Sequence, residues 1–240
     1  MRKFFLIAGL SMSYAISAQK VIDVNTAAPT NGMGQHAFYT VGGVPFVNTK
    51  FVNLISGTPY FSDNWMKGKM ISTKGQGFSG NMIKLDILNN EIHFISVDDK
   101  VFVAAISAKE IWLEDSLTKT KYHLVHSSTV PKPSKAHTTQ WYQLLDTGKI
   151  NLYKAIQKVV TETLPYGAST HEQRIITSAL YFISIDNSLQ PLKSLKELTT
   201  YLPAYKKEVE VFVKNLDTKK TSADEQWIQV VQYYKTLDIK

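Results

Sequence analysis

The chain has 240 residues, of which 44% are hydrophobic and 20% are charged, a composition typical of a globular protein with one large or two small domains. It contains no cysteine, which excludes disulfide bonds, thiol catalysis, cysteine-based zinc sites and lipid attachment at an N-terminal cysteine. Its formal net charge of +7 favours anionic partners.

Residues 1–18 have the three parts of a cleavable secretory signal. A positively charged start, Arg2-Lys3, is followed by the apolar stretch 4–10 and then by small residues. The apolar stretch is shorter than the roughly 20 residues that span a bilayer, so it is not an anchor. We therefore expect cleavage after Ala18 and export of the mature chain to the periplasm, the outer membrane or the medium.

Residues 19–34 are small and polar and lack periodicity, which predicts a flexible N-terminal arm. Residues 35–190 form short apolar runs separated by turn residues, a pattern that indicates strands of an antiparallel β-meander. Several runs are apolar at both odd and even positions, so we expect the sheet to curl, fold over or be covered by helices. The predicted strands are Ala37–Val41, Pro45–Ile55, Trp65–Thr73, Met82–Leu88, Glu91–Val97, Lys100–Ala105, Glu110–Glu114, Lys121–His126, Gln140–Leu145, Asn151–Val159 and Ile175–Ile185.

Within residues 191–240 the apolar spacing changes from two to about 3.6, which predicts about three amphipathic helices packed on the β body. The Ser-x-x-Glu sequences at 194–197 and 222–225 have the spacing of capping boxes, and Pro203 suits the first turn of a helix. The predicted fold class is therefore α+β, mainly β. The predicted helical stripes contain Leu195, Leu198 and Leu202, then Tyr205, Val209, Phe212 and Leu216, and finally Trp227, Val230, Val231, Tyr234 and Leu237.

Two groups of residues carry a resemblance to known proteins. The first group contains Gly57-Thr58-Pro59-Tyr60-Phe61, Asp63-Asn64-Trp65, Gly68, the Gly75/Gly77 turn, and Lys84-Leu85-Asp86-Ile87 before Asn89-Asn90-Glu91. The second group contains Tyr181-Phe182-Ile183, Leu192-Lys193, Leu195, Leu198, Leu202, Val213-Lys214-Asn215, Glu225 and Tyr233-Tyr234. Over roughly residues 41–237, the chain resembles a widespread family of exported envelope proteins of Gram-negative bacteria with no assigned activity. The resemblance implies compartment and fold, and it brings no catalytic residues.

Positive charge is concentrated in residues 116–158, which hold seven lysines against the single acid Asp146. The loop that contains Lys132 and Lys135 has two prolines, which lower the entropy lost on binding an anion. Because lysine binds phosphate as a point charge, we expect anionic envelope glycans or lipid headgroups as partners rather than nucleic acid. In the alternative interpretation, these lysines lie on solvated strand edges and a loop and bind no partner. The candidate anion-binding surface consists of Lys119, Lys121, Lys132, Lys135 and Trp141.

Three other patterns do not support an active site. Residues 75–80 match the glycine pattern of dinucleotide-binding proteins, but a strand pattern follows in place of a helix, which predicts a hairpin loop. Residues 116–119 and 62–64 match two motifs of penicillin-binding serine enzymes in the wrong chain order, and the third motif is missing. The acid pairs Asp98-Asp99 and Glu114-Asp115 fall in predicted turns, where acids normally accept backbone hydrogen bonds.

Histidines give no metal site in this interpretation. His123 and His126 should point to opposite faces of one strand, and no acid lies between them and His137. We therefore predict no catalytic, cofactor-binding or metal-binding residues. The expected function is an exported envelope binding or structural module, and the alternative is a periplasmic hydrolase whose site is assembled from distant residues.

Overall fold

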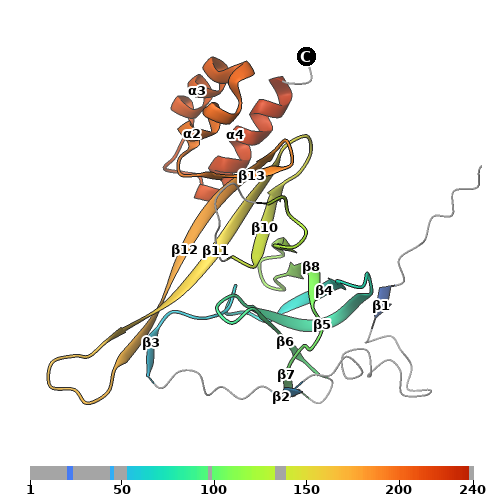
Figure 1. The fold of residues 1–240 in the computed structure, drawn as a ribbon, viewed down its shortest axis with the longest axis vertical. Helices are drawn as coiled ribbons and strands as arrows, with labels where there is room; N and C mark the ends of the chain where they lie inside the picture. Colours follow the sequence, from blue (N-terminus) through green and yellow to red (C-terminus); the bar gives the residue numbers. More distant parts are fainter. Residues whose placement is uncertain (1–20, 24–43, 46–52, 97–98, 133–138, 238–240) are drawn as a thin grey trace, which may run out of the picture.

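The computed structural model describes residues 21–23, 44–45, 53–96, 99–132 and 139–237 (Figure 1). The predicted signal, most of the predicted arm and the predicted strand Ala37–Val41 lie outside the described residues. The described residues are mainly β, with helices at the C-terminal end, which confirms the predicted fold class. None of the described helices combines the length and the apolar character that crossing a membrane requires.

The described residues form thirteen strands that belong to one hydrogen-bonded sheet, and four helical segments follow them. The strands are β1 (Val21–Asp23), β2 (Val44–Pro45), β3 (Leu54–Ser56), β4 (Met66–Ser72), β5 (Gly77–Asp86), β6 (Glu91–Ile95), β7 (Val101–Val103), β8 (Ala108–Glu114), β9 (Lys121–His126), β10 (Trp141–Asp146), β11 (Asn151–Thr163), β12 (Glu172–Ile185) and β13 (Ser188–Leu192). The helical segments are α2 (Leu195–Tyr201), the 3₁₀ turn η1 (Pro203–Tyr205), α3 (Lys206–Asn215) and α4 (Ala223–Leu237).

The strand order is β13-β12-β11-β10-β9-β8-β4-β5-β6-β7-β2, with β1 beside β5 and β3 beside β12. Consecutive strands pair antiparallel from β4 to β7 and again from β8 to β13, as the predicted meander requires. The order of the strands changes once along the chain, because β8 pairs with β4 and not with β7. This pairing satisfies the backbone groups along the second edge of β4, which would otherwise lack partners.

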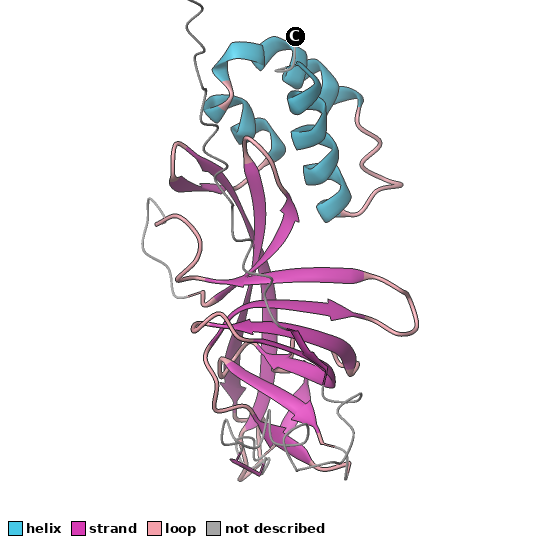
Figure 2. Ribbon diagram, turned by 90° about the vertical axis from the view of Figure 1, so that its right-hand side faces the viewer, coloured by secondary structure: helices cyan, strands magenta, loops and turns pink. Residues whose placement is uncertain are grey.

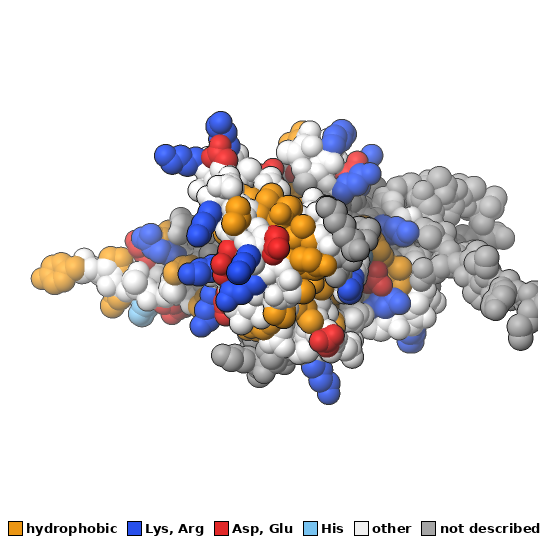
Figure 3. All heavy atoms as spheres, turned by 90° about the horizontal axis from the view of Figure 1, so that it is seen from above, with side chains coloured by type: hydrophobic (Ala, Val, Ile, Leu, Met, Phe, Trp, Pro, Cys, Tyr) orange, Lys and Arg blue, Asp and Glu red, His pale blue; other side chains and the backbone are white. Residues whose placement is uncertain are grey.

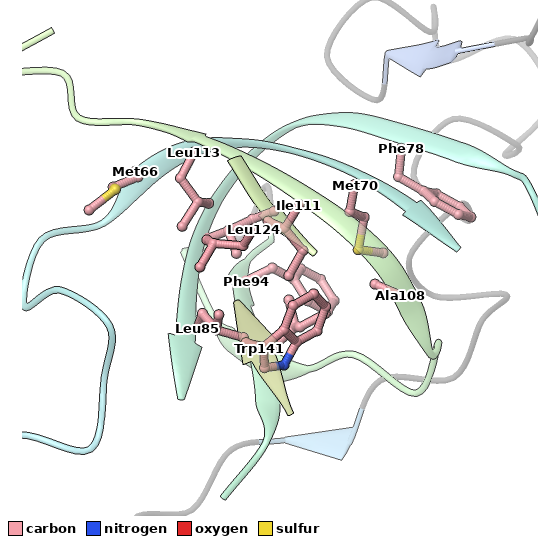
Figure 4. Packing of buried hydrophobic residues seen from close by; sticks show 12 residues of the cluster. Met66, Met70, Phe78, Leu85, Phe94, Ala108, Ile111, Leu113, Leu124 and Trp141 are labelled. Carbon is pink, nitrogen blue, oxygen red and sulfur yellow. The ribbon is translucent and has the colours of Figure 1, made fainter. Parts of the chain in front are cut away.

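The sheet curls around one hydrophobic cluster, as Figures 2 and 4 show. Side chains from β4, β5, β6, β8, β9 and β10 converge in it, although these strands belong to one sheet. The curl brings β10 against the β5–β6 turn, where Trp141 Nε1 donates a hydrogen bond of 2.7 Å to Asn90 Oδ1. The expected curling is therefore confirmed. The cluster contains Met66, Met70, Phe78, Ile83, Leu85, Ile92, Phe94, Ala108, Ile111, Leu113, Leu124 and Trp141.

The helices cover the other end of the molecule, on strands β11 to β13 (Figures 1 and 2). Both predicted capping interactions are present: Ser194 Oγ accepts from Glu197 N, and Ser222 Oγ accepts from Glu225 N. The box at α4 is reciprocal, because Ser222 N donates to Glu225 Oε2 at 2.7 Å. These hydrogen bonds lower the pKa of the Glu225 carboxyl. Apolar side chains gather at the centre of this end, and charges of both signs surround them (Figure 3).

The hairpin of β11 and β12 projects away from the body (Figure 1). The two strands pair from Asn151 with Ser184 to Thr163 with Glu172. Near the tip, only β3 adds a further strand among the described residues, through parallel pairing with β12 at Gln173. The outer part of this hairpin is therefore held mainly by the pairing between its own two strands.

Candidate anion-binding groove

The structure separates the residues that the sequence suggested for anion binding. Lys119 and Lys121 lie at the beginning of β9. Lys132 follows the opposite end of that strand, which is about 17 Å long. Lys135 lies outside the described residues. The four predicted residues that the structure describes therefore do not form one surface.

Trp141 is not part of a surface, and this component of the prediction is wrong. Its side chain is 5% exposed and belongs to the cluster inside the curled sheet. Its indole N–H is satisfied by Asn90, so the polar edge of the ring is also occupied. The proximity of Trp141 to lysines in the sequence gave no information about the face of the strand on which it lies.

Another set of lysines and aromatic residues shares the outer face of β4, β8 and β9. In β4, Met66 and Met70 point into the core, whereas Lys67 and Lys69 are exposed between them. This alternation follows from the two-residue period of a strand. The strand register places two rows of side chains across the three strands on this face.

The first row is Lys69, Trp112 and His123, which are cross-strand neighbours. Lys69 Nζ lies 5.4 Å from the centroid of the Trp112 ring. The Trp112 and His123 rings stack with centroids 4.5 Å apart and an interplanar angle of 13°. His123 Nε2 is 3.2 Å from Glu110 Oε2, which anchors the imidazole. Stacking and hydrogen bonding fix the two rings as a rigid platform beside the lysines.

The second row is Lys67, Glu114 and Lys121, so one carboxylate lies between two ammonium groups. The distance from Lys121 Nζ to Glu114 Oε2 is 3.9 Å, which is long for an ion pair, and the lysine side chain is 78% exposed. Such an exposed pair contributes at most about 1 kcal/mol, so Lys121 can exchange this partner for another anion.

Together the two rows line an open groove with a volume of about 400 Å³. Within the described part of the chain, the ammonium groups of Lys67 and Lys69 take part in no ion pair and no hydrogen bond. The paired strand fixes the backbone positions of both lysines, and their exposed side chains are accessible to a ligand. The groove is lined by Lys67, Gly68, Lys69, Trp112, Leu113, Glu114, Lys121, Tyr122, His123 and Leu144.

Lys132 contributes to a different surface. It lines an open pocket with Lys149, Tyr153 and Asp186, near the β12–β13 turn. Its backbone carbonyl accepts from Leu189 N at 3.2 Å. Lys132 is therefore attached to the strand end that carries the helices, and it is not part of the groove.

The segments that resembled serine-enzyme motifs meet, but they form a turn and no reactive centre. Asn64 Nδ2 donates to Asp115 Oδ2 at 3.1 Å, and Asp115 Oδ1 accepts from the backbone N–H groups of Leu117 and Thr118. The hydrogen bond from Thr118 N, together with those from Asn64 and Leu117, lowers the pKa of Asp115. Ser116 is exposed in this turn. The acid thus shapes the β8–β9 connection, as expected for an acid in a turn.

The histidines near the groove lie apart, as the strand geometry predicts. His123 points into the groove, whereas His126 contacts Ser128 and the edge of the Trp141 ring. Burial lowers the pKa of His126. His137 lies outside the described residues.

Comparison of the chain with family models, with curated proteins and with solved structures finds no match.

Proposed function

We propose that this chain is an exported envelope protein whose groove on β4, β8 and β9 binds phosphate or carboxylate groups of envelope glycans or lipid headgroups. The observation that carries the proposal is the pair Lys67 and Lys69, two ammonium groups without an anionic partner in the described chain, beside the Trp112–His123 platform. The proposed export rests on the sequence of residues 1–18.

The spacing of the lysines suits a ligand with more than one anionic group. Lys67 and Lys69 are two residues apart on one strand, which separates their Cα atoms by about 7 Å. Lys121 lies two strands away, a distance of about 10 Å. A repeating acidic glycan or a surface of anionic headgroups can reach all three lysines, whereas a single small anion cannot.

The ligand also has an apolar contact available. The rim of the groove includes Trp112 and Leu144 in addition to the charged residues. Lys69 extends over one face of the Trp112 ring. If the anionic group of a ligand attracts the Lys69 ammonium group, that face becomes free to contact a sugar ring of the same ligand. This arrangement favours a glycan over an inorganic anion.

Charge reversal in the groove should weaken binding to envelope material. We expect Lys67→Glu/Lys69→Glu to reduce cosedimentation with purified cell wall or anionic lipid vesicles about tenfold, since each exposed charge contact contributes up to about 1 kcal/mol and repulsion replaces it. Binding of the unmodified chain should also decrease with salt, because exposed charges are screened beyond about 8 Å at physiological ionic strength.

The matched control is Lys206→Glu/Lys207→Glu, which makes the same change in net charge at exposed positions of α3. This variant should bind as the unmodified chain does. Cell wall and vesicles tested side by side distinguish a glycan from a headgroup, and vesicles of zwitterionic lipid give the background. Equal binding by the two double variants would contradict the groove as the binding site.

A further inference from the structure

A second cluster of polar side chains lies on the hairpin of β5 and β6, away from the curled core. The register pairs Asp86 with Glu91 and Lys84 with His93, so these four side chains share one face of the hairpin. The alternating residues Ile83 and Leu85 point to the other face and into the hydrophobic cluster. The loop around Tyr60 pairs with the edge of β5 through a bridge to Asp86, and the Tyr60 ring covers part of the polar face, in contact with His93 and Lys84.

Three of these side chains converge. One carboxylate oxygen of Asp86, one of Glu91 and one ring nitrogen of His93 lie within 4.8 Å of one another. Glu91 Oε2 is 3.0 Å from His93 Nε2. Asp86 is 2% exposed and His93 is 1% exposed, whereas the side chain of Glu91 is 28% exposed and gives access from solvent.

Among the described residues, the hydrogen-bond donors to the buried Asp86 carboxylate are all neutral. Asp86 Oδ1 accepts from Asn89 N at 2.8 Å, and Oδ2 accepts from Asn89 Nδ2 at 2.7 Å. In the described part of the chain, no cation lies within ion-pair distance of this carboxylate. A buried carboxylate without a cation is costly, which makes this position suitable for a positively charged ligand.

The lysines in the neighbourhood are engaged elsewhere. Lys84 Nζ lies over the rings of Tyr60 and Trp65, at 4.9 Å and 5.2 Å from their centroids. Lys158 Nζ donates to the carbonyl of Thr58 at 2.8 Å and to Thr177. Burial lowers the pKa of Lys158, and the charges of Asp63 and Asp86 oppose that change. Lys158 therefore partly offsets the negative charge of Asp86 from a distance, and it donates its hydrogen bonds to Thr58 and Thr177 instead of the Asp86 carboxylate.

We propose that Asp86, Glu91 and His93 bind one divalent transition-metal ion, with Zn²⁺ the ion that fits best. Two carboxylates and a neutral imidazole carry two negative charges, which balance the ion. Zn²⁺ accepts mixed nitrogen and oxygen ligands, whereas Mg²⁺ and Ca²⁺ prefer oxygen ligands alone. Water on the exposed side of Glu91 supplies the remaining ligand. The Tyr60 ring, edge-on to His93 with centroids 5.4 Å apart, orients the imidazole.

This inference does not depend on the groove, because it concerns another hairpin and another ligand. The ion would link β5 to β6 directly next to their turn, and we expect it to stabilise the hairpin and the loop that covers it. Metal binding to the native state raises the melting temperature by mass action.

The test uses the untagged chain from Gln19 onward, stripped of metal with a chelator. Zn²⁺ titration by calorimetry, followed by metal analysis after gel filtration, should give one ion per chain, and Co²⁺ should give the visible absorption of a low-symmetry site. We expect Asp86→Asn and Glu91→Gln each to lower the affinity at least 10–100-fold, the effect of losing even an outer-sphere partner of a metal.

Glu110→Gln is the matched control, because His123 and Glu110 form a similar His–Glu pair, at 3.2 Å, outside the three-ligand cluster. This variant should bind Zn²⁺ as the unmodified chain does. Glu91 is partly exposed, so Glu91→Gln tests the site even if Asp86→Asn does not fold, and near-ultraviolet circular dichroism monitors folding. No stoichiometric Zn²⁺ in the unmodified chain, or equal losses in Glu91→Gln and Glu110→Gln, would overturn the proposal.

Discussion

Trp227→Ala should lower the free energy of unfolding by about 3–5 kcal/mol, the usual cost of removing a large core aromatic side chain. Trp227 is 5% exposed and stacks on Tyr181 of β12, with centroids 5.0 Å apart. The substitution removes the stacking contact between α4 and β12 and leaves a cavity in the buried cluster under the helix. Urea-induced unfolding, monitored by far-ultraviolet circular dichroism, measures the change.

Polar contacts hold α4 in the same place, so the cavity should not close by movement of the helix. Asp224 accepts from Tyr181 Oη at 2.6 Å and from Lys154 Nζ at 2.7 Å. At the other end of the helix, Lys235 Nζ is 2.9 Å from Asp146 Oδ2. Burial and the hydrogen bond to Asp224 raise the pKa of Tyr181, so the phenol stays protonated.

Val211→Ala is the control for this prediction. Val211 lies on α3 and is 58% exposed, so its truncation should change stability by less than about 0.5 kcal/mol. A loss below about 1 kcal/mol for Trp227→Ala would mean that α4 is not part of the cooperative core.

The second large effect is expected at Gly57, which brings β3 against β12. Gly57 has a φ of +83°, and a Cβ atom at this position would lie 2.2 Å from the backbone oxygen of Ile175. Gly57→Ala therefore adds backbone strain and also forces β3 away from β12. We expect a loss of about 2–4 kcal/mol, from about 1–2 kcal/mol for the left-handed conformation and a similar cost for overpacking.

Gly167→Ala separates these two terms, because Gly167 has a φ of +80° and, apart from its chain neighbours, no described residue has an atom within 4 Å of the added Cβ. It should cost only the strain of about 1–2 kcal/mol. Thermal and urea unfolding of both variants measure the difference. Equal losses at the two positions would show that β3 is not held against β12 in solution.

Local features of the fold could be predicted from the sequence. The bounds of β9 agree with the predicted strand Lys121–His126, because the Asp115 turn and the apolar alternation are both short-range signals. The capping boxes at Ser194 and Ser222 and the apolar stripe of α4 are local in the same sense. Each of these features depends on residues that are close together in the sequence.

Non-local pairing could not be predicted in this way. Nothing within β4 or β8 specifies that they are neighbours, since their pairing depends on the curl of the whole sheet. Strand β13 was missed because it is short and contains Gln190 and Pro191, and proline is tolerated in it as an edge strand.

The same distinction applies to the sites. The alternation of lysine with buried methionine in β4 could have indicated that Lys67 and Lys69 are exposed, but only the register brings Trp112 and His123 beside them. The polar face of the β5–β6 hairpin was available from the sequence. A hairpin that turns at Asn89-Asn90 places Asp86, Glu91 and His93 on one face if its loop has two or four residues, and the structure has the four-residue loop, with Asp86 opposite Glu91.

Lysine footprinting tests the proposed binding groove most directly. The chain is treated with an amine-acetylating reagent in the presence and absence of cell wall or anionic vesicles, and the modification of each lysine is measured by mass spectrometry. The proposal predicts that Lys67, Lys69 and Lys121 are protected together, in a salt-dependent manner, while Lys206 and Lys207 on α3 remain reactive. Protection of the helical lysines instead, or equal reactivity of all of them, would contradict it.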